Sequence, residues 1–181
     1  MERLSPELTG AVIVMTGPPG AGKSTASSQL VTLAERGVLI DGDAFFQAVK
    51  AGWTAPWLPE SGEQNGTVID ALGAAASRYA RGGYVVIVDG IVGPWFLERF
   101  RAEVTGPLHY VVVRPNRNAA FARATSRPSS HLTEPEPVKK MYDEFESIGV
   151  YERCVIDNSM QTLVETVNAI ADGLSEGRFR V

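Results

Sequence analysis

The sequence predicts a single α/β domain in which helices cover both faces of a parallel β-sheet. Short runs rich in Val and Ile alternate along the chain with segments of helical periodicity, and strands buried on both faces have this composition. The chain has 181 residues, 44% hydrophobic and 21% charged, which fits one globular domain with a sizeable core. No internal repeat or low-complexity tract divides residues 1–181, so we expect them to form one unit.

Five continuous apolar runs are the expected strands, because each is short and rich in aliphatic residues. In chain order they are residues 11–16, 37–41, 84–89, 108–113 and 153–157. The segments between and after them carry apolar residues at helical spacing. These expected helices are residues 24–35, 44–51, 66–80, 95–103, 118–126, 136–148 and 160–175. Because such alternation implies parallel strands, their carboxyl ends meet at one edge of the sheet, where ligands bind.

The stretch Gly17-Pro18-Pro19-Gly20-Ala21-Gly22-Lys23-Ser24-Thr25 fits the phosphate-binding pattern G-x-x-x-x-G-K-[ST] between the first strand and the first helix. In that context backbone N–H groups and a helix N-terminus converge on one anion. Pro18 and Pro19 have no N–H, so the donors are expected from residue 20 onward. The motif predicts a nucleoside triphosphate with Mg²⁺, with Lys23 on the β- and γ-phosphates and Ser24 on the metal. The expected binding residues are Gly17, Gly20, Ala21, Gly22, Lys23, Ser24 and Thr25.

Three aspartates lie at or just past the ends of the second and third expected strands. Asp43 is our candidate for the catalytic base, because a carboxylate near the γ-phosphate aligns an acceptor hydroxyl and accepts its proton. The alternative role for Asp43 is to cap the helix expected at 44–51. Asp41 is the second candidate for the base, and it is placed with the substrate-binding residues, with positioning of the loop as a further alternative. Asp89 is expected to orient a water on Mg²⁺ together with Ser24, and its alternative is a solvated acid at a strand end.

Arginines gather after the fourth expected strand, and Arg123 and Arg127 share a helix face. The planar guanidinium suits phosphate. We expect a lid around residues 117–137, with Arg127 as a catalytic phosphate clamp and Arg123 stacked on the adenine. Both are candidate cofactor-binding residues. Asn158, after the fifth strand, either borders the base pocket or belongs to a turn in which Ser159 caps the last helix.

Residues 43–66 are the expected acceptor-binding region, because they contain a loop with two Trp and two Pro. Phe46, Trp53 and Trp57 are candidates for an acceptor pocket. The alternative for such rings is packing in the core. The two tryptophans on the proline-rich loop are the better candidates for contact with an acceptor.

The bulk composition excludes several classes of function. A net charge of −4 and a pI near 5.3 argue against a nucleic-acid binder. Cys154 is the only cysteine, which rules out an internal disulfide and fits a reducing compartment. No apolar run is long enough for a membrane span, and the N-terminal residues lack a signal-peptide pattern, so a cytoplasmic location is expected. The two histidines form no ligand cluster, so no histidine metal site is assigned.

Beyond these residue patterns, the chain resembles the small P-loop kinases of the chloramphenicol phosphotransferase-like type, which are related to gluconate and shikimate kinases. The resemblance rests on the phosphate loop, on Asp43 with the hydrophobic pair after it, on residues 86–89, on Glu98-Arg99-Phe100-Arg101, and on Arg114, Arg123 and Arg127. It implies a three-layer P-loop NTPase fold with strand order 2-3-1-4-5. It also implies ATP-dependent phosphorylation of a hydroxyl, with Asp43 as base and Arg123 and Arg127 in a lid. Gly90, which we include in the acceptor site, stands where the chloramphenicol enzyme has a second acid, which favours a different acceptor.

The sequence therefore predicts an ATP- and Mg²⁺-dependent phosphotransferase acting on a hydroxyl of a small molecule, such as an antibiotic or nucleoside-type natural product. A metabolic kinase of a sugar acid or nucleoside is the alternative enzyme. A nucleotide-gated regulatory protein is the alternative of another class. We expect a monomer or homodimer that binds neither nucleic acid nor membrane.

Overall fold

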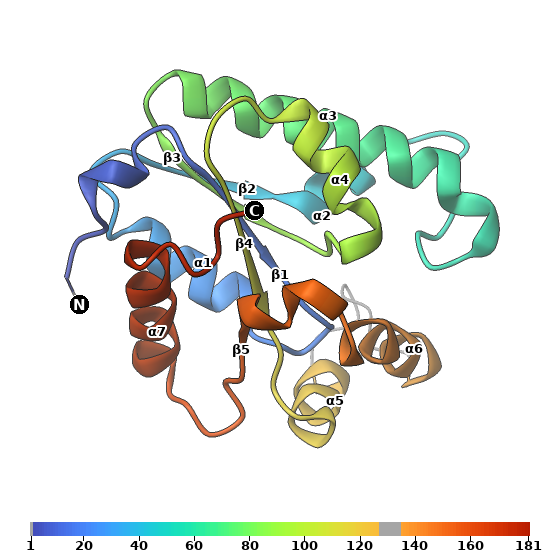
Figure 1. Ribbon diagram of the computed structural model, residues 1–181. Helices are drawn as coiled ribbons and strands as arrows, with labels where there is room; N and C mark the ends of the chain where they lie inside the picture. The colour runs from blue at the N-terminus through green and yellow to red at the C-terminus, as the bar shows by residue number, and fades with distance from the viewer. Residues whose placement is uncertain (1, 127–134) are drawn as a thin grey trace.

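The computed structural model describes residues 2–126 and 135–181. At its centre lies a five-stranded sheet of order β2-β3-β1-β4-β5 in which all neighbouring strands are parallel (Figure 1). The strands are β1 (Val12–Thr16), β2 (Gly37–Asp41), β3 (Val85–Asp89), β4 (Leu108–Val113) and β5 (Val155–Ile156). The predicted fold class and strand order are both confirmed, and β1 and β4 are buried along their whole length.

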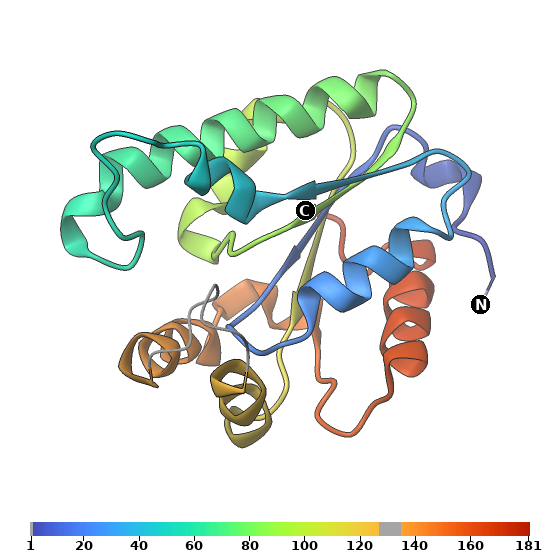
Figure 2. The same ribbon diagram turned by 180° about the vertical axis from the view of Figure 1, so that it is seen from behind.

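Helices cover both faces of the sheet. They are α1 (Lys23–Val31), α2 (Gly42–Gln47), α3 (Gly62–Arg81), α4 (Pro94–Glu103), α5 (Arg117–Thr125), α6 (Pro135–Glu146) and α7 (Leu163–Ser175). Short 3-10 turns are η1 (Pro6–Leu8), η2 (Pro59–Ser61) and η3 (Gly149–Cys154). Figures 1 and 2 show α3 and α4 together on one face and α1 and α7 on the other, with α5 and α6 beyond the end of β4. This arrangement leaves the loops at the carboxyl ends of the strands to form a site.

Strand β2 differs from the expectation that every strand is buried on both faces. It lies at the edge of the sheet, and of its five residues only Ile40 is buried. An edge strand has a single neighbour and incomplete helix cover, which the apolar sequence of the segment does not reveal.

The last strand is much shorter than the expected 153–157. Residues Gly149–Cys154 form the 3-10 turn η3, and only Val155 and Ile156 pair with β4. The Glu152 carboxylate accepts from the backbone N–H of Ile148 at 2.9 Å and so closes this turn. Cys154 is buried at its end rather than within a strand.

Two helix starts differ from the sequence expectation because of capping. Helix α7 begins at Leu163, not at residue 160, because Thr162 and Glu165 form a capping box. The Ser159 cap suggested by the sequence is therefore wrong. Helix α2 begins at Gly42 because the Asp41 carboxylate accepts from the backbone N–H of Asp43 at 2.9 Å. Asp41, and not Asp43, is the N-cap of α2.

Within residues 2–126 and 135–181, no helix combines the length and the apolar character that a bilayer crossing requires.

Candidate functional site

The phosphate loop joins β1 to α1 and depends on glycine at two close approaches. A Cβ on Gly17 would lie 2.1 Å from the carbonyl oxygen of Val113, and one on Gly20 would lie 2.0 Å from that of Ala120. Both residues, and Gly22 at the N-cap of α1, have positive φ angles that L side chains rarely adopt. The loop therefore passes between β4 and α5 in a conformation that only these glycines permit.

The N-terminus of α1 faces out of this loop. The first intrahelical bond runs from the N–H of Ala26 to the carbonyl of Gly22, so the N–H groups of Ser24 and Thr25 precede it. Both residues are exposed. The N–H of Ala21 instead donates to the carbonyl of Pro18 at 3.2 Å, and Ala21 itself is fully buried. Its amide is thus occupied by the turn, unlike the expectation that it donates to phosphate.

Lys23 is buried against the loop that it follows. Its Nζ donates to the carbonyl oxygens of Gly17 at 3.0 Å and Pro18 at 3.1 Å. These two acceptors hold the ammonium group over the loop, where a polyphosphate would be cradled.

Asp89 ends β3 beside Ser24 and Lys23. Burial raises the pKa of its carboxyl above the ordinary value, although a hydrogen bond with the Ser24 side chain and the charge of Lys23 act in the opposite direction. Its Oδ1 is buried without a hydrogen-bond partner among the described residues. A carboxylate oxygen in this state suits a divalent cation or the water bound to one.

Asp41 and Asp43 lie close to Asp89. Asp41 is the register partner of Asp89 across β2 and β3, and the charges of both Asp41 and Asp43 contribute to the raised pKa of Asp89. Asp41 and Asp43 are exposed. The backbones beneath them are in contact, since a Cβ on Gly90 would lie 3.4 Å from the Cα of Gly42. The structure thus brings together the acids that the sequence placed at the ends of two strands.

Asn158 connects the loop after β5 to the phosphate loop. Its side-chain Nδ2 donates to the carbonyl of Ala21 at 3.0 Å, while its buried Oδ1 has no partner among the described residues. The side-chain amide of Asn158 therefore holds the phosphate loop in place at Ala21.

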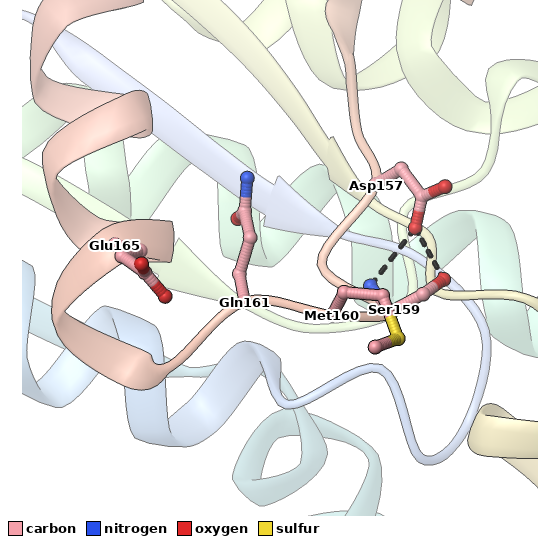
Figure 3. Close-up of a pocket in the computed structure, with 5 residues that line it drawn as sticks. All are labelled: Asp157, Ser159, Met160, Gln161 and Glu165. Atoms are coloured by element: carbon pink, nitrogen blue, oxygen red, sulfur yellow. Dashed lines mark hydrogen bonds between the residues drawn. The ribbon is translucent and has the colours of Figure 1, made fainter.

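A shallow cavity of about 400 Å³ is lined by Asp157, Ser159, Met160, Gln161 and Glu165 (Figure 3). Asp157 and Ser159 are the sequence neighbours of Asn158. Figure 3 shows the side chains of Met160 and Gln161 on opposite sides of the loop and Glu165 on the first turn of α7. The Asp157 carboxylate accepts from both the N–H and the hydroxyl of Ser159, and these bonds lower its pKa. The cavity therefore has a fixed anionic rim.

Two of the arginines after β4 are engaged in structural contacts. Arg114 donates to the carbonyl of Phe145 and forms an ion pair with Glu152 at 2.8 Å, and Arg117 pairs with Asp143 and Glu146 on α6. Arg123 is exposed on the last turn of α5. Arg127 and residues 127–134 of the expected lid lie outside the described residues.

The loop before α3 is held by side chains that the sequence interpretation missed. Gln64 accepts from the N–H of Thr54 at 2.8 Å and donates to its carbonyl at 2.7 Å, and Asn65 donates to the carbonyl of Pro56 at 2.7 Å. The signal available was a pair of amides at the start of a helix, directly after a proline-rich loop. The loop is therefore an ordered part of the structure.

The candidate acceptor residues are dispersed over these segments. Trp53 is 49% exposed, and Trp57 and Phe46 are partly buried. Gly90 is buried, and its N–H donates to the carbonyl of Met15 at 3.2 Å. Among the described residues no group of three or more His, Cys, Asp or Glu side chains is placed to hold a metal by itself.

Comparison with known proteins gives a family and a fold. Residues 12–148 match the AAA domain family AAA_33. No curated protein sequence matches the chain. Solved structures of similar fold include a sugar kinase from Janibacter sp. HTCC2649, with a TM-score of 0.69, 17% identity and coverage of 92% of this chain and 95% of that chain.

Two further structures have the same fold. A gluconokinase from Sinorhizobium meliloti 1021 has a TM-score of 0.70 and 20% identity over 93% of each chain. The tunicamycin resistance protein of Deinococcus radiodurans has a TM-score of 0.66 and 15% identity, covering 91% of this chain and 95% of that chain. At these identities the likeness shows a shared fold.

Proposed function

Because this chain belongs to the AAA domain family AAA_33 and has the fold of small P-loop kinases, we propose that it transfers the γ-phosphoryl group of ATP to a hydroxyl of a small molecule. The observation that carries this proposal is the grouping of the Gly17–Thr25 loop with Asp89 and Asp43 at the carboxyl edge of the sheet. A phosphate loop next to an exposed carboxylate is the arrangement that phosphoryl transfer to an alcohol requires.

In this reaction the acceptor oxygen forms a bond to the γ-phosphorus. The bond from that phosphorus to the β–γ bridging oxygen breaks, and ADP leaves with the bond's electron pair. Asp43 accepts the hydroxyl proton, and its exposed carboxylate in the first turn of α2 is available for this role. Lys23 exchanges its carbonyl partners for phosphate oxygens and stabilises the charge on the transferred group.

The donor set near Asp89 fits a magnesium ion that arrives with the nucleotide. The Ser24 hydroxyl would bind it directly and Asp89 through water, which gives the unpartnered Oδ1 of Asp89 a role. The ion would neutralise negative charge on the β- and γ-phosphates. The cavity lined by Asp157, Ser159 and Gln161 would take the base, and Arg123 would cover it.

Two classes of acceptor are compatible with this chemistry. We favour an antibiotic or nucleoside-type natural product, because one protein of this fold is a tunicamycin resistance protein and because the expected acceptor-binding region, residues 43–66, contains Trp53 and Trp57. A metabolic acceptor is supported by the sugar kinase and gluconokinase of the same fold.

The direct test is to incubate the protein with ATP, Mg²⁺ and a panel of hydroxylated antibiotics, nucleosides and sugars. Mass spectrometry should detect the gain of one phosphoryl group on an acceptor, with an equal amount of ADP formed. Lys23→Ala should abolish the gain. A protein that hydrolyses ATP only to phosphate, with no acceptor modified, would instead indicate a nucleotide-gated regulator.

A further inference from the structure

The segments that follow β2 and β3 flank Asp43, and their charges are strongly one-sided. From residue 37 to residue 77 the sequence contains no arginine and a single lysine, Lys50, against Asp41, Asp43, Glu60, Glu63 and Asp70. Residues 82–98 contain Asp89 and Glu98 and no Lys or Arg. Because these segments begin at the carboxyl ends of adjacent strands, an acceptor next to Asp43 enters an acidic environment.

Two cations on the neighbouring helices α1 and α4, Lys23 and Arg99, are engaged by other groups. Lys23 donates to the carbonyls of the phosphate loop. Arg99 forms a two-pronged ion pair with Asp70, with Nε–Oδ1 at 2.6 Å and an N–O distance of 2.5 Å for the second contact. The same guanidinium lies against Gly66, where a Cβ would approach it to 2.6 Å. Arg99 is thus occupied by Asp70, and Lys23 is assigned above to the phosphates of ATP rather than to the acceptor.

Large aromatic rings are exposed in the same segments. Trp53 is 49% exposed although the next residue, Thr54, is fixed by two hydrogen bonds to Gln64. Trp95, 46% exposed at the start of α4, is held against Gly93 and against the ring of Phe145, with 5.5 Å between the ring centroids. Exposed rings on an ordered backbone provide rigid apolar contact area for a ligand.

On the basis of the phosphotransferase function proposed above, we propose that the acceptor carries no carboxylate or phosphate group and places a flat apolar face against Trp53. An acidic acceptor would meet the charges of Asp41, Asp43 and Asp89, and residues 37–77 offer only Lys50 against them. An ammonium-bearing acceptor is attracted by these carboxylates, and a neutral acceptor is not repelled by them. Either one gains the contact with the aromatic ring. This selects against sugar acids and for aromatic or nucleoside-like alcohols.

The test uses three probes that share a hydroxymethylphenyl group: 4-(hydroxymethyl)benzamide, 4-(aminomethyl)benzyl alcohol and 4-(hydroxymethyl)benzoate. Binding is followed by isothermal titration calorimetry with a non-hydrolysable ATP analogue and Mg²⁺ present. The neutral and ammonium probes should bind at least about tenfold more tightly than the benzoate, a difference of about 1.4 kcal/mol. Trp53→Ala should remove most of this binding. Tyr79→Ala, which removes an equally exposed ring (49%) from the last turns of α3, should leave it unchanged.

Equal or tighter binding of the benzoate, or no binding of any probe, overturns the inference. So does retained affinity in Trp53→Ala. These outcomes are separable from failure of the phosphotransferase proposal, because binding is measured without turnover. Efficient phosphorylation of a sugar acid would reject the acceptor class and keep the enzyme. Selective binding of the neutral and ammonium probes by a protein that phosphorylates no alcohol would keep the acceptor class and reject the phosphotransferase function.

Discussion

The side-chain amide of Asn158 donates to the carbonyl of Ala21 at 3.0 Å, which joins the loop after β5 to the phosphate loop across 137 residues of sequence. The bond is buried, so the carbonyl has no access to water in its place. The geometry of the phosphate loop therefore depends on a residue from the far end of the domain.

Asn158→Ala should leave the Ala21 carbonyl buried without its donor. We expect a loss of about 1–3 kcal/mol in the free energy of unfolding, and a higher Kd for ATP. Urea unfolding and ATP titration measure both. Asn168→Ala, at an exposed position on α7, is the matched control and should change neither quantity. An Asn158→Ala protein with the wild-type free energy of unfolding and the wild-type Kd for ATP would show that this hydrogen bond does not support the loop.

Gly20→Ala should destabilise the protein far more than Gly52→Ala. Both glycines have positive φ, 79° and 70°, so both variants carry similar backbone strain of about 1–2 kcal/mol. Only at Gly20 does the new Cβ meet a backbone atom, the Ala120 carbonyl oxygen at 2.0 Å, whereas nothing lies within 4 Å at Gly52. Thermal unfolding of the two variants compares them directly. Equal melting temperatures would contradict the close packing of the loop on α5.

Asp89→Asn should stabilise the nucleotide-free protein at neutral pH. Burial raises the pKa of the Asp89 carboxyl in the folded state above its unfolded value, so the folded state disfavours the charge. Below the unfolded pKa, ordinarily 3.8, both states are protonated and this group carries no penalty. As pH rises through the folded pKa, stability is lost in the wild type only. The difference in the free energy of unfolding between Asp89→Asn and wild type, followed from about pH 3 to about pH 7, should therefore grow as the pH rises.

An Asp89→Asn protein that is less stable than wild type at pH 7 without nucleotide or Mg²⁺ would contradict this account of the carboxyl. The same variant should lose phosphoryl transfer, so its greater stability would separate the role of the charge in folding from its role in the reaction.

The parts of the fold that were predictable are those with strong local patterns. The phosphate loop has a fixed spacing, and the apolar runs that became β1, β3 and β4 are short, rich in Val and flanked by Gly or Pro, which favours buried strands. β2 was located correctly, but its exposure depends on its place in the sheet, which a run of aliphatic residues does not encode. β5 was overestimated because the Glu152 turn competes for the same residues.

The candidate site likewise has residues that the sequence could predict and contacts that it could not. Lys23, Ser24, Asp89 and Asp43 could be proposed from motif and position, because each follows a strand. Asp41 and Asp43 are two residues apart, and which of them caps α2 was decided by a backbone hydrogen bond that neither spacing nor residue type distinguishes. The bond of Asn158 to Ala21 and the bonds of Gln64 to Thr54 join segments whose proximity only the folded chain establishes.

The central claim is that Asp43 accepts the acceptor's proton in phosphoryl transfer, and a paired measurement on Asp43→Asn tests it most directly. The account predicts that ATP binds with a Kd within about twofold of wild type, while the rate of phosphoryl transfer to a confirmed acceptor falls by about 10²–10⁴. Asp43 is exposed, so the substitution should leave the fold intact. Transfer by Asp43→Asn at the wild-type rate would contradict the account.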